Sequence, residues 1–251
     1  MRIAVAGGTG LVGRYVVDAA ERAGHDVVVL ARSRGVDVLT GEGLAAALAG
    51  ADAVIDATNS GTTLSARKAT RFFEAATRHL LAAEASAGVG HHVALSIVGI
   101  DGIDASYYAG KLAQERAVAA GSVPSTIARV AQFHEFAGQL LAGMGGPIAV
   151  LPRMLMRPVA AREVGEHLVR VAESGPVGRA ADLVGPRDEV LVDVARRQLA
   201  FEGARRRVIE VRLPGAYGRG LASGSLRGGA DAVQGTTTFD EWLRSEDHTL
   251  R

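Results

Sequence analysis

The first half of the chain alternates short apolar runs with longer segments of helical periodicity. Five short runs rich in Val, Ile or Ala predict buried strands at residues 3–6, 27–31, 53–57, 93–96 and 126–130. Between them, apolar residues spaced by three and four predict amphipathic helices at residues 12–23, 43–49, 64–87 and 105–120. Strands that alternate with helices pair in parallel through right-handed crossovers. The pattern therefore predicts an α/β fold with an open, doubly wound parallel sheet.

Beyond residue 130 the alternation becomes irregular. We expect helices at residues 132–144, 162–173 and 190–201 and a strand at residues 207–213. Loops are expected at residues 152–158 and 215–235, and a short last helix at residues 239–243 is expected to dock through Trp242. The chain is thus predicted to form a single domain over residues 1–251, with a core of residues 1–131 and a small C-terminal lobe of residues 132–251.

Composition narrows the class of protein. The chain has 251 residues, 48% of them hydrophobic, which excludes a disordered chain, a collagen and a coiled coil. Its 28 Lys and Arg against 27 Asp and Glu argue against a dedicated nucleic-acid-binding protein. Gly7, Gly8 and Gly10 interrupt the apolar start, which is untypical of a signal peptide. We expect a cytoplasmic monomer or homodimer that has a small-molecule substrate and no membrane, nucleic-acid or metal partner.

A glycine triplet follows the first predicted strand and opens the first predicted helix. Gly7, Gly10 and Gly13 have the spacing G-x-x-G-x-x-G, which chance alone would produce about 0.5 times in this chain. The position between strand and helix is more informative, because backbone N–H groups and the helix dipole there face a pyrophosphate. The alternative is a turn that merely lets strand and helix pack closely. We expect a Rossmann-type dinucleotide site that includes Gly7, Thr9, Gly10, Leu11, Val12 and Gly13.

The end of the second predicted strand indicates which dinucleotide is bound. An acid in this position binds the ribose 2′-hydroxyl of NAD, but here Arg32, Ser33 and Arg34 stand instead. Guanidinium groups suit a 2′-phosphate, so the sequence predicts that NADP(H) is preferred over NAD(H). The alternative is a solvated basic loop. Asp37, past the turn, is expected to reach the adenine.

A second motif, Tyr107-x-x-x-Lys111, lies on the predicted helix 105–120. Because the chain has only four Tyr and two Lys, chance predicts this pair about 0.03 times. At positions i and i+4 both side chains share one helix face, where an ammonium would lower the pKa of the phenol and bind the nicotinamide ribose. Ser96 ends the preceding predicted strand, and its hydroxyl is expected to polarise a substrate carbonyl.

Together, the glycine run, Ser96 and the Tyr107/Lys111 pair resemble the short-chain dehydrogenase/reductase superfamily. The segments HHVALSIVGID, YYAGKLAQE and ARVAQFHEF resemble its atypical, NmrA-like NAD(P)-binding branch. This resemblance is sharpest over residues 1–136. It implies that Tyr107 is the general acid/base, that Lys111 binds ribose and tunes Tyr107, and that Ser96 orients the carbonyl.

The resemblance also implies further cofactor contacts. Ala57, Thr58 and Asn59 follow the predicted strand 53–57, where the family lines the adenosine and the nicotinamide ribose, although the standard motif there is Asn-Asn-Ala-Gly. Phe133 follows the strand 126–130, where family members contact nicotinamide, and a packing role is an equal alternative. The family's proton-relay Asn has no candidate in this sequence.

These expectations combine into one leading function. The chain is expected to be an NADP(H)-dependent oxidoreductase that transfers hydride between nicotinamide and a small apolar carbonyl or quinone-like substrate, with Tyr107 as general acid/base. The small C-terminal portion would bind the substrate. The alternative is a non-catalytic NADP(H)-sensing regulatory protein of the NmrA-like type. Sugar-nucleotide epimerisation is a third possibility, disfavoured because residues 132–251 are few for the substrate domain of such enzymes.

Overall fold

The computed structural model describes residues 1–61 and 65–249, so position 64, where the helix 64–87 is expected to begin, lies outside the described residues. The chain forms two compact units. Unit 1 comprises Met1–Ser96, Asp104–Arg129 and Arg162–Ala181. Unit 2 comprises Ile97–Ile103, Val130–Ala161 and Asp182–Arg251. The chain passes from one unit to the other near the expected boundary at residue 131, but residues 162–181 return to unit 1.

Unit 1 is built on a parallel sheet, as the alternating sequence pattern predicts. The strand order is β2-β1-β3-β4-β5, with β8 beside β5. Ile3 of β1 lies opposite Val27 on one side and Ala53 on the other. Every residue of β3 and nearly every residue of β1 is buried, which explains their continuous apolar sequences. The strands are β1 (Arg2–Ala6), β2 (Asp26–Leu30), β3 (Ala53–Asp56), β4 (His91–Ile97), β5 (Ser125–Val130) and β8 (Gly178–Arg179).

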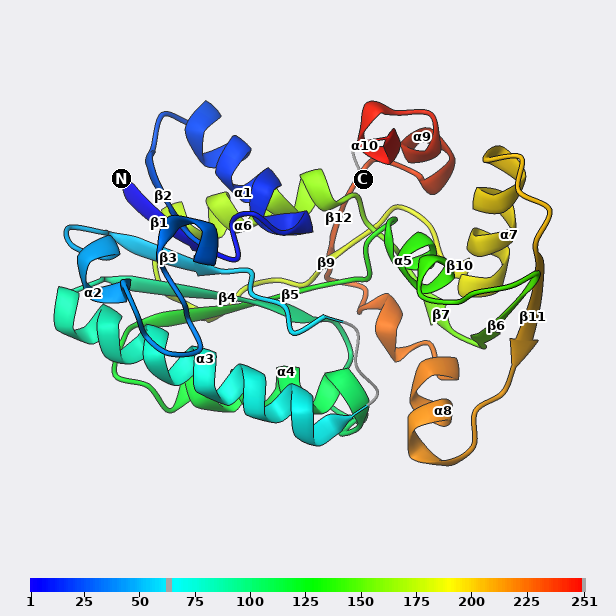
Figure 1. Ribbon diagram of the computed structural model, residues 1–251, viewed down its shortest axis with the longest axis horizontal. Coiled ribbons are helices and arrows are strands. Elements are labelled where there is room, and N and C mark those ends of the chain that lie inside the picture. Colours follow the sequence, from blue (N-terminus) through cyan, green and yellow to red (C-terminus); the bar gives the residue numbers. More distant parts are fainter. Residues whose placement is uncertain (62–64, 250–251) are drawn as a thin grey trace. The chain divides into compact units, whose positions relative to one another are not determined.

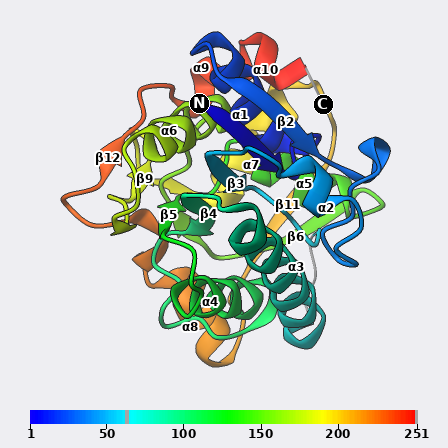
Figure 2. The ribbon, with the colours of Figure 1, turned by 90° about the vertical axis from the view of Figure 1, so that its left-hand side faces the viewer.

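Helices cover both faces of this sheet, which confirms the doubly wound, Rossmann-type architecture. In Figures 1 and 2, α3 and α4 lie on one face and α1 and α6 on the other. Close packing of α3 and α4 depends on Gly110, where a Cβ atom would lie 2.7 Å from the Cβ of Ala69. The helices are α1 (Leu11–Arg22), α2 (Leu44–Ala47), α3 (Ala66–Ala87), α4 (Ser106–Ala119) and α6 (Ala161–Glu173), with a 3-10 turn η1 (Arg32–Arg34) after β2.

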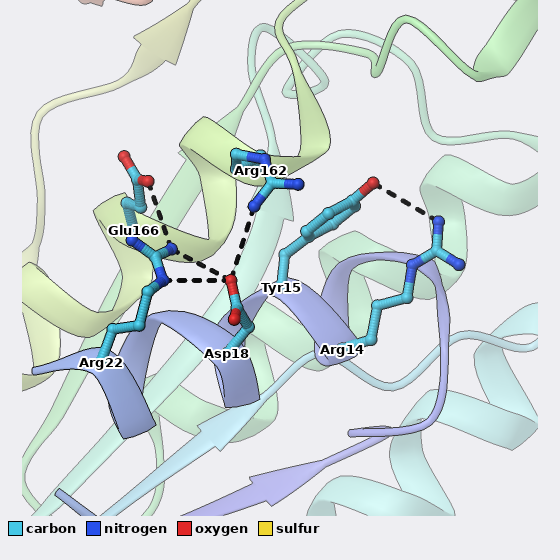
Figure 3. A network of polar contacts seen from close by, with 6 residues as sticks. All are labelled: Arg14, Tyr15, Asp18, Arg22, Arg162 and Glu166. Carbon is cyan, nitrogen blue, oxygen red and sulfur yellow. Dashed lines mark hydrogen bonds and ion pairs between the residues drawn. The ribbon is translucent and has the colours of Figure 1, made fainter. Parts of the chain in front are cut away.

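Helix α6 joins unit 1 through its contact with α1. A Cβ atom at Gly165 would lie 2.6 Å from the backbone carbon of Tyr15, so the two helices approach closely at this point. Polar groups surround the contact (Figure 3): Arg22 of α1 bonds Asp18 at 3.1 Å, and Arg162 of α6 reaches the same carboxylate at 3.5 Å. These half-exposed ion pairs contribute little each, so the apolar packing carries the interaction.

Unit 2 contains small paired strands and further helices. β6 (Ile148–Pro152) pairs in parallel with β11 (Arg207–Val211), and β7 (Leu155–Met156) pairs antiparallel with β10 (Glu189–Val190). β9 (Leu183–Val184) pairs in parallel with β12 (Val233–Gln234). The helical segments are α5 (Phe136–Ala142), α7 (Leu191–Phe201), α8 (Gly215–Ala222), η2 (Ser225–Arg227), α9 (Phe239–Leu243) and α10 (Glu246–Thr249).

The short helix expected at residues 239–243 is confirmed as α9, but it is not the last helix, because α10 follows it. Trp242 is 1% exposed, and its ring stacks on that of Phe239 with centroids 5.5 Å apart. Thr238 caps the helix, because its side chain accepts a hydrogen bond from the backbone N–H of Glu241. The docking of this helix through Trp242 follows from the burial of both aromatic rings.

Three expectations for unit 2 are wrong. Residues 215–235 are not a continuous loop, because Leu221 and Leu226 are buried and hold α8 and η2 in place. Residues 152–158 include strand β7. The helix expected from residue 132 begins only at Phe136, because Gln132 and His134 exchange backbone hydrogen bonds with Val159. In each case a partner distant in sequence overrides the local pattern.

Across the described residues, none of the helices combines the length and the apolar character that crossing a membrane requires.

Candidate functional site

Three of the four residues in the loop between β1 and α1, residues 7–10, are glycines. Gly7 has φ +75°, a conformation that favours glycine, and a Cβ atom there would lie 2.8 Å from the carbonyl oxygen of Ala57. A Cβ atom at Gly13 would lie 2.0 Å from the carbonyl oxygen of Gly7. Gly10 donates its N–H to the same oxygen at 2.8 Å, which closes the turn. Gly7, Gly10 and Gly13 therefore let the chain fold back tightly against the end of β3.

The amino end of α1 is open to an anion. Gly10 is the N-cap residue in an extended conformation, and no side chain caps the helix. The N–H groups of the first turn thus lack intrahelical acceptors, and no acidic residue stands in that turn. Thr9 and Gly10 are exposed and Leu11 is half-buried, whereas the Val12 side chain packs into the core. This arrangement fits the phosphates of a dinucleotide, which the helix dipole also favours.

Arg32, Ser33 and Arg34 form the turn η1 directly after β2, and all three are exposed. Among the described residues, neither guanidinium group makes an ion pair with a carboxylate. Asp37 lies further along, and its carboxylate accepts a hydrogen bond from the backbone N–H of Leu39 at 2.8 Å. The two arginines are thus available to a ligand, while Asp37 also serves its own turn.

The segment after β3 carries Ala57, Thr58 and Asn59. Asp56, the last residue of β3, is fully buried and accepts a hydrogen bond from the backbone N–H of Thr58 at 2.9 Å. The Thr58 hydroxyl is also buried and has no hydrogen-bond partner among the described residues. Asn59 is exposed, and its Oδ1 accepts hydrogen bonds from the Tyr107 hydroxyl at 3.2 Å and from the N–H of Gly61 at 2.9 Å.

Tyr107 lies in the first turn of α4 with its ring edge-on to Phe73, the ring centroids 5.6 Å apart. Burial and the negative charge of Asp56 raise the pKa of the Tyr107 phenol above its usual value. The sequence predicts the opposite direction, on the ground that Lys111 lowers this pKa. That expectation is wrong for the protein alone, because burial disfavours the phenolate. The hydroxyl therefore keeps its proton at neutral pH.

Lys111 lies one turn further along α4 and is 3% exposed. Its Nζ donates a hydrogen bond to Oε1 of Gln114 and lies 4.5 Å from the ring centroid of Phe73. Burial lowers the pKa of the Lys111 ammonium to about 8, against the raising effects of Asp56 and Glu115. Because the Phe73 ring contacts both side chains, the structure brings Tyr107 and Lys111 to one aromatic residue.

Ser96 has different partners from those that the sequence suggests. It lies within β4, is 1% exposed, and donates its hydroxyl to Oε1 of Glu115. Arg129 of β5 bonds the same carboxylate through Nε at 2.8 Å and Nη2 at 2.6 Å. The structure therefore brings Ser96 to a buried ion pair and shows no bond between its hydroxyl and Tyr107. This engagement removes the free hydroxyl that carbonyl polarisation would need.

The sequence does not identify five residues of this site, because their roles depend on partners far along the chain. Asp56 in β3 and Arg129 in β5 give one signal in the sequence, a charged side chain inside an otherwise largely apolar strand. The five residues are Asp56, Phe73, Gln114, Glu115 and Arg129.

Phe133 belongs to unit 2, whereas the other expected cofactor contacts belong to unit 1. It forms an isolated parallel bridge with Val159 and is half-buried. Its contact with nicotinamide stays a prediction.

Comparisons with known proteins agree with this fold. Residues 3–120 match the model of the NAD dependent epimerase/dehydratase family. The search of curated proteins finds no match. Similar solved structures include the NADPH-dependent quinone oxidoreductase of Escherichia coli complexed with NADPH, 18% identical over 99% of this chain and 100% of that chain, with a TM-score of 0.72. The chain has the Rossmann-type fold of NAD(P)-binding reductases.

Two further structures extend the comparison. The triphenylmethane reductase of Citrobacter sp., complexed with NADP(H), is 17% identical over 97% of this chain and 99% of that chain, with a TM-score of 0.70. A UDP-N-acetylglucosamine 4-epimerase from Bacillus cereus is 18% identical over 100% of this chain and 98% of that chain, with a TM-score of 0.69. All three structures share the fold of this chain at TM-scores of 0.69 to 0.72.

Proposed function

We propose that this protein is an NADP(H)-dependent oxidoreductase that transfers hydride between nicotinamide and a small apolar carbonyl or quinone-like substrate. The observation that carries the proposal is the position of the Tyr107 hydroxyl, which bonds Asn59 at 3.2 Å, while the Tyr107 ring adjoins Phe73, which also contacts Lys111. A phenol can donate its proton to the oxyanion that hydride transfer creates on a substrate. That property suits the reduction of a carbonyl or quinone.

The glycine loop and η1 support the cofactor assignment. The N–H groups at the start of α1 would hold the pyrophosphate, and the guanidinium groups of Arg32 and Arg34 would bind the 2′-phosphate with the Ser33 hydroxyl. Two of the similar structures are named as complexes with NADPH or NADP(H), which is consistent with a preference over NAD(H). When bound, the reduced cofactor supplies the hydride.

The residues of α4 would supply the proton chemistry. Tyr107 Oη would donate its proton to the developing oxyanion of the substrate, and solvent would return a proton to it. Lys111 would hold the nicotinamide ribose through its ammonium group. Ser96 would fix α4 and β5 against β4 through Glu115, so the stabilisation of the oxyanion would fall to Tyr107.

The direct test is NADPH oxidation by the purified protein with a panel of quinones and small carbonyl compounds. We expect turnover with at least one acceptor, and a loss of about 100-fold or more in kcat for Tyr107→Phe with unchanged NADPH affinity. Tyr217→Phe, on α8, is the matched control. NADPH binding without turnover, in the wild type and in Tyr107→Phe alike, would contradict the proposal and favour an NADP(H) sensor.

Sugar-nucleotide epimerisation is a second candidate, supported by the family match over residues 3–120 and by the similar epimerase structure. The argument from length against it does not hold, because this chain covers 98% of that epimerase. An epimerase would interconvert a UDP-sugar without net consumption of NADPH. Incubation with UDP-N-acetylglucosamine, followed by separation of the sugar products, distinguishes the two reactions.

A further inference from the structure

Two opposite charges lie in the interior of unit 1 with an amide between them. Asp56, at the end of β3, is 0% exposed, and Lys111, on α4, is 3% exposed. Gln114 is itself fully buried; its Nε2 donates to Oδ2 of Asp56 at 2.7 Å, and its Oε1 accepts from Nζ of Lys111. The connection thus runs from carboxylate to amide to ammonium.

The amide of Gln114 has only one favourable orientation here. Its NH₂ group donates and its carbonyl oxygen accepts, so a carboxylate on one side and an ammonium on the other determine which end faces which. The reversed orientation would place two acceptors together and two donors together, without water to compensate. Gln114 therefore holds a fixed orientation and presents an acceptor to Lys111.

The other side of Lys111 is limited by Phe73. The ammonium lies over the Phe73 ring at 4.5 Å, a favourable cation–π distance. Charged groups that face Lys111 are Asp56 from β3 and Glu115 from its own helix, and Glu115 is paired with Arg129. Asp56, in contrast, makes no ion pair among the described residues. Gln114 connects its carboxylate to Lys111.

We propose that Gln114 is a positioning residue for Lys111, and that together with Asp56 it keeps this side chain oriented and protonated. The functional meaning rests on the proposed role of Lys111 in binding ribose, because only the ammonium form offers three donors. Without the amide, Lys111 would lose its acceptor and its connection to the negative charge. Burial would then favour the neutral amine.

The composition of the chain allows a direct test. Lys68 and Lys111 are its two lysines, so a protein labelled with 13C and 15N lysine gives two side-chain signals, and Lys68→Arg assigns them. Lys68 is exposed and serves as the internal reference. For the wild type we expect Lys111 to titrate at about pH 8. The titration requires neither cofactor nor substrate, so its outcome does not depend on the proposed reaction.

The variants decide the proposal. Gln114→Met, similar in size and without a strong acceptor, and Asp56→Asn should each shift the Lys111 titration down by about one pH unit or more. Gln114→Glu should shift it up. Two control variants should leave the Lys111 titration unchanged. Gln198→Met removes a buried amide in unit 2, and Asp52→Asn removes an exposed carboxylate. If Gln114→Met does not fold, as judged by circular dichroism, Gln114→Glu carries the test.

Three results would overturn the inference: an unchanged Lys111 titration in Gln114→Glu, an unchanged Lys111 titration in Asp56→Asn, or a wild-type Lys111 that titrates at the ordinary lysine value of about 10.4. A kinetic comparison then tests the functional part. In Gln114→Met the KM for NADPH should rise about 10-fold at pH 7.5 and recover partly at lower pH, where Lys111 is protonated again. A merely structural role would lower activity equally at all pH values. Failure to bind NADPH at all would contradict the proposed function and leave the result of the titration intact.

Discussion

The hydroxyl of Tyr107 donates a hydrogen bond to Oδ1 of Asn59, across 48 residues of sequence and 3.2 Å of space. The same oxygen accepts from the N–H of Gly61, so the Asn59 carbonyl is held between helix α4 and the segment after β3. The sequence alone offers no candidate for the proton-relay Asn, and this contact brings the one Asn of the chain to the phenol.

Asn59→Ala should lower kcat about 10-fold, because the phenol loses the acceptor that orients it. The free energy of unfolding should change by less than about 1 kcal/mol, since Asn59 is exposed. NADPH oxidation and urea unfolding measure the two effects. Ser60→Ala removes the neighbouring hydroxyl, which donates a hydrogen bond to the carbonyl oxygen of Gly61, and serves as the control. Equal activities of both variants would show that the Asn59 contact has no role in the reaction.

Arg32→Ala and Arg34→Ala should each weaken NADPH binding by about 10-fold or more, which corresponds to the loss of a charge-assisted bond to phosphate. NADH binding should stay within about twofold, because NADH lacks the 2′-phosphate. Fluorescence titration with both cofactors measures this difference. Arg71→Ala on α3, another exposed arginine, is the control. Equal losses for NADPH and NADH would mean that the arginines do not read the 2′-phosphate.

Gly13→Ala should destabilise the fold by about 2 kcal/mol and abolish cofactor binding. The added methyl group would collide with the carbonyl oxygen of Gly7 at 2.0 Å, and backbone there has no room to shift without opening the loop. Gly145→Ala, where no atom lies within 4 Å of the added carbon, should be neutral. Thermal melting and NADPH titration test both variants. A Gly13→Ala protein that binds NADPH normally would exclude this loop as the pyrophosphate site.

The buried pair of His92 and Glu84 predicts a pH dependence of stability. Burial lowers the pKa of His92, but the hydrogen bond and the charge of Glu84 outweigh it, with a further contribution from Asp56, so the pKa of His92 is raised above 6.5. A group whose pKa is higher in the folded state stabilises the fold fully below its unfolded pKa. This contribution is lost as the pH rises through the folded value.

The wild-type free energy of unfolding should therefore decrease as the pH rises above about 6.5. Glu84→Gln should be less stable by about 3 kcal/mol at pH 6, and its stability should depend less on pH in this range. Urea unfolding at several pH values measures both. Glu173→Gln, which removes the exposed partner of His25, should keep the wild-type pH dependence. A Glu84→Gln profile parallel to that of the wild type would contradict this assignment.

Sequence reasoning was most reliable in unit 1, where periodicity and strand–helix alternation are local properties. The strands β1 to β5 and the helices α1, α3 and α4 follow from runs of apolar residues that each segment carries within itself. It was least reliable for residues 215–235, because Gly-rich composition indicated a loop while buried Leu221 and Leu226 hold regular structure. Two buried leucines in such a segment do not produce the hydrophobic periodicity from which a helix is predicted.

The sequence by itself determined the alternation of strands and helices in unit 1, the glycine-rich loop around Gly7 and Gly10, and the presence of Tyr107 and Lys111 one turn apart on a helix. Each of these depends on residues close together in the chain or on the conformational freedom of glycine. Only the tertiary structure decided which groups these side chains face: Asn59 for Tyr107, Gln114 and Asp56 for Lys111, Glu115 for Ser96. Most of these partners come from other elements of the fold. Their pairing follows from the requirement that polar groups removed from water find one another, which no local pattern encodes.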